Sequence, residues 1–356
     1  MREHLTRAWV EVDLGAIRRN AALLATRGAR LLPMVKADAY GLGAVPVARA
    51  LAALDPWGFG VATVDEGIEL RDAGITHPIV IFTPLVPDDL GAAREARLTP
   101  TLGHAREIAA WRAAGGGAWH LAIDTGMSRA GVRWDAVDAL YDALAACPPE
   151  GACTHYHSAQ LDDGTLAEQA ERFALALAAL PARPALVHAE NSAALARADR
   201  SPWTLARPGI FLYGVGSGAP LRPEPVVRLR ARVVDVRAVH AGESVSYDAT
   251  WRADGDRRIA TLAIGYADGY RRALSARGVA LLHGVRVPVA GLVTMDMTML
   301  DVTGVPCAPG DVATLVGSDG RAGLDVESVA RAGALSPYEL LTGLRGRLPR
   351  VYVEGA

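Results

Sequence analysis

The sequence predicts an α/β fold, in which an N-terminal (β/α)8 barrel of the TIM type precedes a C-terminal, mostly-β domain. Two observations lead to this prediction. Up to about residue 220 of the 356, short apolar runs alternate with alanine-rich segments of helical composition, and beyond it apolar runs follow one another with turn residues between them. A cluster of glycine and proline at Gly216–Pro225 separates the two patterns. We therefore expect a barrel at residues 1–220 and a β domain at residues 221–356.

Eight apolar runs in the first part have the length of buried parallel strands. Candidate helices such as Ala44–Leu54, Val64–Ala73 and Leu166–Leu180 lie between them. This alternation indicates a parallel sheet with right-handed crossovers, and eight units favour a closed barrel, with an open doubly wound sheet as the alternative. No GxGxxG motif follows the first run, which argues against a dinucleotide-binding fold. The runs are Leu31–Val35, Gly58–Ala62, Pro78–Phe82, Leu98–Leu102, Trp119–Ile123, Gly151–Thr154, Leu186–His188 and Leu205–Ala206.

The second part is predicted to form a small, mostly antiparallel β domain. Its apolar runs are rich in valine and leucine and are separated by turn residues. One further segment, Leu324–Ala334, has the composition of a helix. The expected strands are Val226–Val239, Arg258–Ile264, Ala280–Val289, Gly291–Val302 and Val312–Val316.

The composition excludes several classes of protein. Hydrophobic residues make up 51% of the chain, which suits a large core and argues against disorder. The formal net charge is −2, from 37 basic and 39 acidic residues, and gives no argument for nucleic acid or an anionic membrane as a partner. No apolar run could span a bilayer and the charged N-terminus does not resemble a signal peptide, so we expect a cytoplasmic protein. The three cysteines lack metal-ligand spacing, so we expect reduced thiols and no metal site.

The stretch Leu31–Gly43, LLPMVKADAYGLG, carries the first chemical signal. It places Lys36 at the end of a buried strand, although lysine is rarely buried. Apolar surroundings disfavour the ammonium and lower its pKa, which makes the amine nucleophilic enough to form a Schiff base with an aldehyde. The alternative is that Lys36 only extends past the end of the strand into solvent.

Polar residues also follow several other barrel strands. Arg129 follows the fifth run, His155 the sixth, Ser192 the seventh and Arg207 the eighth. Because the C-terminal ends of barrel strands form one face, on which barrel enzymes carry their active sites, we expect these side chains to gather around Lys36.

Several segments resemble motifs of alanine racemases, the barrel-type enzymes that use pyridoxal 5′-phosphate (PLP). They are VKADAYG around Lys36, GESVSYDATW around Tyr247, ARPGIFLYG around Arg207, VTMDM around Met295, and GYADGYRR, which contains Tyr266. The resemblance covers nearly the whole chain. It implies a PLP-dependent racemase that interconverts L-alanine and D-alanine with two bases. Lys36 would bind PLP covalently and take the proton of D-alanine, and Tyr247 would take that of L-alanine.

The resemblance also implies roles for the other candidate residues. Arg207 would donate a hydrogen bond to the pyridine nitrogen of PLP, because an arginine cannot accept a proton. Either His155 or Arg207 would supply the positive charge that helps Tyr247 to ionise. His155 would be a further cofactor contact, and the remaining ones would lie at the phosphate group: Tyr40, Ser192, Gly209, Ile210 and, with less support, Tyr352.

The substrate would be held by its carboxylate. In the family an arginine at the position of Arg129 binds this group, together with the backbone amide at Met295, with Asp296 and Tyr266 in supporting positions. Many members carry a carbamylated lysine at the position of Ala122, bonded to that arginine. Alanine cannot replace it, so chloride, water or another side chain is left to hold Arg129.

The resemblance further implies a homodimer, because Tyr247, Met295 and Asp296 of the family reach the barrel of the partner subunit. The expected role is the supply of D-alanine, a peptidoglycan precursor. Two alternatives stay open: a racemase for serine or of broader specificity, and a non-catalytic PLP-binding or PLP-homeostasis protein. Proteins of the second kind lack the β domain. A PLP-dependent decarboxylase shares the architecture, but its cysteine motif is absent from the second half of the sequence.

Overall fold

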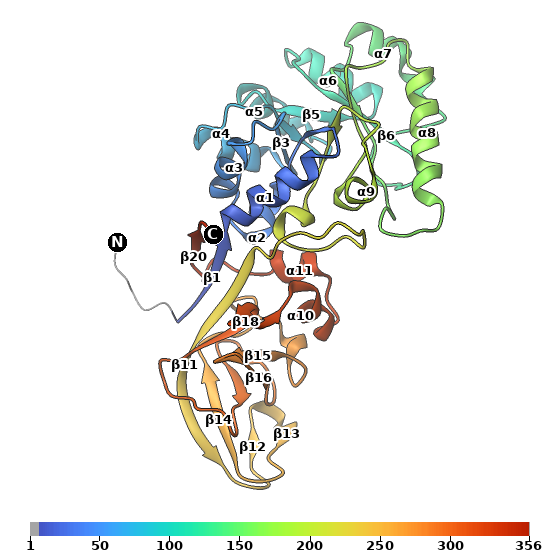
Figure 1. The fold of residues 1–356 in the computed structure, drawn as a ribbon. Coiled ribbons are helices and arrows are strands. Elements are labelled where there is room, and N and C mark those ends of the chain that lie inside the picture. Colours follow the sequence, from blue (N-terminus) through green and yellow to red (C-terminus); the bar gives the residue numbers. More distant parts are fainter. Residues whose placement is uncertain (1–6, 356) are drawn as a thin grey trace.

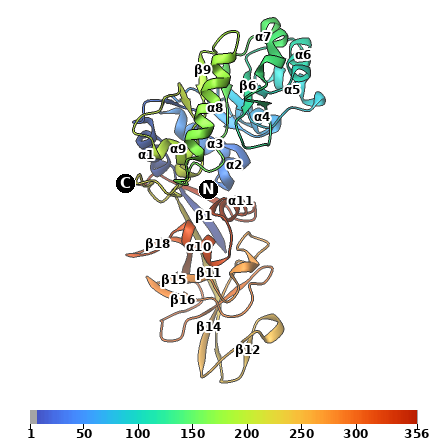
Figure 2. The same ribbon diagram turned by 90° about the vertical axis from the view of Figure 1, so that its right-hand side faces the viewer.

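In the computed structural model, which describes residues 7–355, the chain forms a barrel and an elongated β domain (Figures 1 and 2). Eight parallel strands lie in the order β2-β10-β9-β8-β6-β5-β4-β3. A parallel bridge joins Met34, just after the first of them, to Gly60 of the last, so the sheet curls back on itself. The predicted barrel is confirmed. Its strands are β2 (Arg30–Leu31), β3 (Phe59–Val61), β4 (Ile79–Ile81), β5 (Thr99–Leu102), β6 (His120–Asp124), β8 (Gly151–Cys153), β9 (Leu186–His188) and β10 (Leu205–Ala206), with the short β7 (Val132–Arg133) beside β6.

Helices connect the barrel strands, and some of them begin at polar caps. The Asp13 side chain accepts the amide of Ala16 at the start of α1, and Thr63 and Glu66 form a capping box at the start of α4. Nowhere in residues 7–355 is a helix long and apolar enough to cross a membrane. The helices of this part are α1 (Leu14–Ala25), α2 (Lys36–Gly41), α3 (Ala44–Ala52), α4 (Val64–Asp72), α5 (Leu90–Glu95), α6 (Ala105–Ala113), α7 (Tyr141–Ala146), α8 (Thr165–Ala179) and α9 (Ser192–Arg197).

The C-terminal domain is mostly β, as predicted. Its main sheet has the order β16-β15-β18-β11-β1-β20, with β14, β17 and β19 attached, and the hairpin β12-β13 stands apart. The strands are β11 (Val227–Val239), β12 (Ser244–Val245), β13 (Trp251–Arg252), β14 (Arg257–Leu262), β15 (Val279–Leu282), β16 (Val285–Pro288), β17 (Thr298–Asp301), β18 (Val312–Asp319), β19 (Ala322–Leu324) and β20 (Arg350–Val353).

Several features differ from the prediction. The expected strand Ala280–Val289 is a hairpin of β15 and β16, and only β17 of the expected Gly291–Val302 is a strand. The strand β1 (Ala8–Asp13), placed with the barrel on sequence grounds, belongs to the C-terminal sheet, where it pairs with β11 and β20. Its sequence AWVEVD alternates buried and partly exposed residues, which is the pattern of a half-buried sheet rather than of a barrel strand. In place of one helix at Leu324–Ala334, the chain forms α10 (Val326–Ala332) and a second helix, α11 (Pro337–Thr342), which begins at a Ser336 capping box.

Candidate functional site

A cavity of about 370 Å³ opens at the C-terminal ends of the barrel strands. It brings together eight of the residues singled out in the sequence: Lys36, Tyr40, Arg129, His155, Ser192, Arg207, Gly209 and Ile210. They come from segments that follow β2, β6, β8, β9 and β10, so the barrel topology alone explains why residues far apart in sequence meet here. The rest of its lining is Met34, Ala37, Phe82, Asn191, Tyr338 and Thr342.

Lys36 opens a left-handed turn. The four residues Ala37–Tyr40 all have φ between 51° and 58°, a conformation that costs an L-residue roughly 1–2 kcal/mol. Such a turn persists only where its surroundings hold it. The Glu66 carboxylate accepts the amide of Ala37 at 2.7 Å, and the Asp38 carboxylate accepts the amide of Ala44 at 2.7 Å. These contacts hold the backbone at the beginning of the turn and just beyond its end.

The surroundings of Lys36 favour its neutral form. Burial lowers its pKa, and the positive charges of Arg129 and Arg207 lower it further, while Glu66 opposes the shift. The amine therefore gives up its proton more readily than a free lysine does. This is the property that a nucleophilic or basic lysine needs.

Hydroxyl groups and close-packed backbone form one side of the cavity. The ring of Tyr40 lies on that of Tyr213, with centroids 4.6 Å apart. The Ser192 hydroxyl oxygen accepts the backbone amides of Gly209 at 2.9 Å and Phe211 at 3.3 Å. Gly209 has to be glycine, because a Cβ there would overlap the hydroxyl of Tyr40.

Arg207 is fully enclosed at the base of the cavity. Its guanidinium donates to the carbonyl oxygens of Thr154, His188 and Ala189 at 2.5–3.1 Å. It also donates to Nδ1 of His188 at 2.6 Å, and Nε2 of His188 lies 2.7 Å from Nδ1 of His120. Because arginine only donates, His188 must carry its single proton on Nε2. Burial lowers the pKa of both histidines, so His188 and His120 are neutral. Their hydrogen bonds hold the Arg207 guanidinium in place.

His155 lies beside Arg207, with Nδ1 3.5 Å from the guanidinium. Burial and the charges of Arg207, Arg129 and Lys36 lower its pKa to about 3. The expectation that His155 could supply a positive charge is therefore wrong, since its imidazole stays neutral at physiological pH. Arg207 remains the fixed cation at this point of the site.

His155→Gln is expected to weaken the loss of stability on acidification. Between the unfolded pKa near 6.5 and the folded pKa of about 3, the unfolded chain binds a proton at His155 and the folded chain does not, so stability falls as the pH falls. From pH 7 to pH 5 this histidine accounts for about 2 kcal/mol of the loss. Chemical denaturation of both proteins at the two pH values measures it, and identical losses would contradict the neutral assignment.

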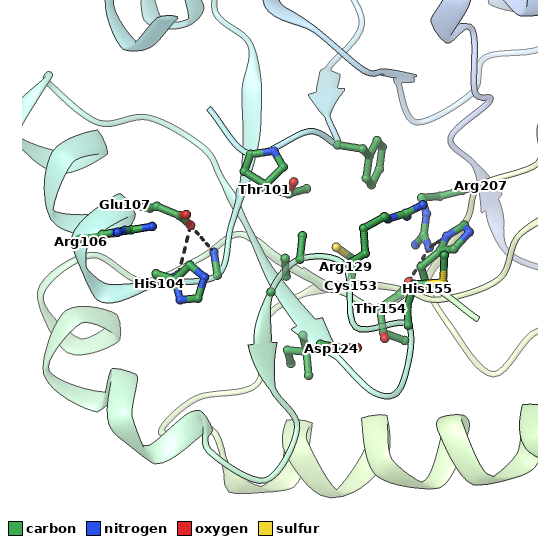
Figure 3. Close-up of a pocket in the computed structure, with 18 residues that line it drawn as sticks. Thr101, His104, Arg106, Glu107, Asp124, Arg129, Cys153, Thr154, His155 and Arg207 are labelled. Atoms are coloured by element: carbon green, nitrogen blue, oxygen red, sulfur yellow. Dashed lines mark hydrogen bonds between the residues drawn. The ribbon is translucent and has the colours of Figure 1, made fainter. Parts of the chain in front are cut away.

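A second cavity of about 280 Å³ lies beside Ala122 (Figure 3). It shares Phe82, Arg129, His155 and Arg207 with the first. Arg129, His155 and Arg207 gather on one side of it, and His104, Arg106 and Glu107 on the other. Among residues 7–355 the Arg129 guanidinium has no hydrogen-bond or ion-pair partner. No side chain of the described residues takes the place of a lysine at Ala122.

Four candidates of the β domain lie outside the cavity of their own chain. Tyr247 is 69% exposed and Met295 53% exposed, and Tyr266 is also exposed. They are held near one another, because the Ser246 hydroxyl donates to the carbonyl of Leu292 and the Tyr266 amide donates to that of Thr294. The fourth, Asp296, accepts a hydrogen bond from Arg347.

Tyr352 does not reach the cavity either. Its hydroxyl donates to the carbonyl oxygen of Leu42 behind the lysine turn. A different tyrosine, Tyr338 of α11, lines the cavity and faces the ring of Tyr40 at 6.0 Å. Its segment SPYE signals only a helix start, so no sequence pattern would have placed it here.

Comparison with known proteins gives consistent matches along the chain. The family model "Alanine racemase, N-terminal domain" matches residues 12–217, and "Alanine racemase, C-terminal domain" matches residues 226–352. An alanine racemase of Carboxydothermus hydrogenoformans is 38% identical over 97% of this chain and 99% of its own length. The crystal structure of alanine racemase from E. faecalis superposes with a TM-score of 0.92 at 31% identity, covering 98% of both chains. That of Bartonella henselae alanine racemase "with covalently bound pyridoxal phosphate" gives 0.90 at 27% identity, over 98% and 99% of the two chains.

Proposed function

Because the chain belongs to the alanine racemase family, we infer that it is a PLP-dependent isomerase that interconverts L-alanine and D-alanine. One observation supports this inference independently of the similarity to known alanine racemases. Of the 37 lysines and arginines in the sequence, Lys36 is the only lysine. An arginine stays protonated, whereas a lysine can lose its proton and bond to an aldehyde. The chain keeps its one such amine in the cavity where the other candidate groups converge.

The residues of the cavity fit PLP. Lys36 would bond to its aldehyde, the hydroxyls of Tyr40 and Ser192 would hold its phosphate, and Arg207 would donate a hydrogen bond to its pyridine nitrogen. Arg207 is buried and has no paired carboxylate among the described residues. This environment suits a pyridine nitrogen that is unprotonated and accepts a hydrogen bond. A volume of about 370 Å³ lies in the range of small-molecule sites. When bound, PLP draws electrons from the α-carbon of the substrate and so makes its proton acidic.

We assign the two proton transfers to Lys36 and Tyr247. Racemisation removes the α-proton from one face of the α-carbon and returns a proton to the other, which two groups on opposite faces do most simply. Lys36 Nζ, whose pKa is lowered by burial, takes the proton of D-alanine. The phenolate oxygen of Tyr247 takes that of L-alanine and becomes the hydroxyl. Arg207, fixed by backbone carbonyls, holds its protons throughout.

The substrate carboxylate is assigned to Arg129, whose guanidinium lines the cavity and has no partner among residues 7–355. A planar guanidinium can donate two parallel hydrogen bonds to a carboxylate. The backbone amide of Met295 is the second proposed donor, with Asp296 and Tyr266 supporting it. The other phosphate contacts are assigned to the backbone of Gly209 and Ile210, and Tyr338 takes the place that Tyr352 does not reach.

Incubation with a panel of L-amino acids, read by chiral chromatography, tests this function. Alanine is expected to approach an equal mixture of enantiomers faster than serine or larger amino acids do. Faster conversion of serine would favour the broader-specificity alternative. No conversion by the PLP-loaded protein would favour the PLP-binding alternative, against which the matched C-terminal domain already argues.

We further propose that the active protein is a homodimer with shared sites. The support is that Tyr247, Tyr266 and Met295 are exposed together on the β domain, while the cavity that needs a second base lies in the barrel of the same chain. Large apolar side chains exposed as a group mark interaction surfaces. In a two-fold dimer the same contact would form twice, and each β domain would complete the partner's cavity.

Mixing two inactive variants is expected to restore activity. A hybrid of Lys36→Ala and Tyr247→Phe subunits has one site with both changes and one site with neither, if each site takes its lysine from one chain and its tyrosine from the other. After unfolding and refolding in equal amounts, half the dimers are hybrids, so about a quarter of wild-type activity should return. Mixing without refolding is the control. No recovery in refolded dimers would place both groups on one chain.

The setting is proposed to be the cytoplasm, with D-alanine supplied for peptidoglycan. The support is that Cys147, Cys153 and Cys307 are all free thiols, as is usual in a reducing compartment. Expression in a bacterium that requires D-alanine tests the role, since growth without added D-alanine is expected.

A further inference from the structure

The C-terminal end of the chain holds the left-handed turn that carries Lys36. Arg350, at the start of β20, donates from Nε and Nη2 to the carbonyl oxygen of Gly41 at 3.1 and 2.8 Å, 309 positions away in sequence. The helix α11 packs on the same point, because a Cβ on Gly41 would lie 2.5 Å from the carbonyl oxygen of Leu341. The two views show α2 and α11 side by side at the junction of barrel and β domain (Figures 1 and 2).

Arg350 also forms hydrogen bonds to a second backbone segment, residues 344–348. The same guanidinium donates to the carbonyl oxygens of Leu344, Arg345 and Leu348 at 2.9, 2.8 and 2.6 Å. A guanidinium has five N–H groups in a rigid plane, so one side chain can bridge two segments at a fixed distance. A lysine ammonium at this position could not span the same set of acceptors.

The turn needs contacts of this kind at both ends. Four consecutive non-glycine residues in the left-handed region are unfavourable, and they persist only where their surroundings over-determine them. Glu66 holds the beginning of the turn through the amide of Ala37. At its end the charged contact comes from Arg350, and Tyr352 adds a neutral one to Leu42.

We propose that Arg350 is a positioning residue for Lys36: it anchors the end of the left-handed turn at Gly41 and so fixes the direction from which the lysine amine enters the cavity. Arg350 does not line the cavity, so it acts only through the backbone of the turn. The assignment rests on the proposed function, in which Lys36 handles the proton of D-alanine.

The test compares Arg350→Gln with Arg71→Gln in the PLP-loaded enzyme. Arg71 is a matched control, because it also donates to four carbonyl oxygens, all of them in residues 75–97 and none in the lysine turn. Two measurements are made: hydrogen exchange of the amides of residues 37–43, and exchange of the α-proton of each alanine enantiomer with solvent. The Ala39 and Gly43 amides, which donate to Val35 and Asp38, report directly on the turn.

In Arg350→Gln the amides of the turn are expected to exchange at least about 10-fold faster, and the α-proton of D-alanine to exchange about 10-fold more slowly relative to that of L-alanine. Arg71→Gln should change neither. Unchanged exchange rates of the turn amides overturn the proposal. So do faster turn amides with an unchanged ratio of the α-proton exchange rates of the two enantiomers.

If Arg350→Gln does not fold, Arg350→Lys is measured instead. Exchange of the turn amides that is about 3-fold faster supports the proposal, and unchanged exchange overturns it. A wild-type enzyme that does not racemise alanine would refute the proposed function, while the amides would still report on Arg350.

Discussion

Lys36→Ala is expected to slow racemisation by at least about 10⁴-fold and to abolish covalent retention of PLP. The change removes the nucleophile that binds the cofactor and, in our assignment, the base for D-alanine. Because Lys36 is the only lysine in the sequence, no neighbouring lysine can take over either task. Reduction of the holoenzyme with borohydride, followed by peptide mass analysis, should place the cofactor on the peptide that contains Lys36 and nowhere else.

Lys36→Arg separates the charge of the lysine from its reactivity. An arginine keeps the positive charge near Glu66 and the length of the side chain, but it cannot lose its proton or bond to an aldehyde at neutral pH. It should therefore be as inactive as the alanine variant while folding like the wild type. An arginine variant that retains activity, or a reduced cofactor found on another peptide, would refute the assignment of Lys36.

The barrel could be predicted from the sequence because its strands are short continuous apolar runs. The cavity could be predicted because the C-terminal ends of parallel barrel strands meet at one face. Lys36, Arg129, Ser192 and Arg207 needed no more than that rule to be placed together. The lone lysine is a further signal that requires no resemblance, because a chain that uses arginine at every other basic position has a chemical reason to keep one lysine.

Other parts of the site depend on contacts that no local pattern encodes. Tyr338 and Arg350 reach the lysine turn from the far end of the chain. The left-handed turn itself contradicts the conformational preference of alanine, aspartate and tyrosine, and tertiary contacts override that preference. The charge of His155 follows from burial and from three neighbouring cations, which become known only once the fold is known.

Tyr247→Phe is expected to slow exchange of the α-proton of L-alanine with solvent by about 10²–10⁴-fold, while D-alanine keeps most of its exchange rate. Phenylalanine fills the same space as tyrosine but carries no hydroxyl, so only the base for L-alanine is lost. Lys36, held by its own turn in the barrel, remains able to remove and return the proton of D-alanine. Incubation of each enantiomer in deuterated water, followed by mass spectrometry, measures the two rates.

Exchange must be measured because racemisation rates cannot distinguish the two bases. L-alanine and D-alanine have equal free energies in water, so kcat/KM for the two directions is equal in the wild type and in every variant. A change at either base therefore lowers the rates of both directions together, and only exchange without inversion separates one face from the other.

Tyr141→Phe is the control and should leave both exchange rates unchanged. Tyr141 is exposed, and its hydroxyl donates to the carbonyl oxygen of Ala179 on the outside of the barrel. Equal losses for the two enantiomers in Tyr247→Phe would exclude the two-base assignment, whatever its effect on racemisation.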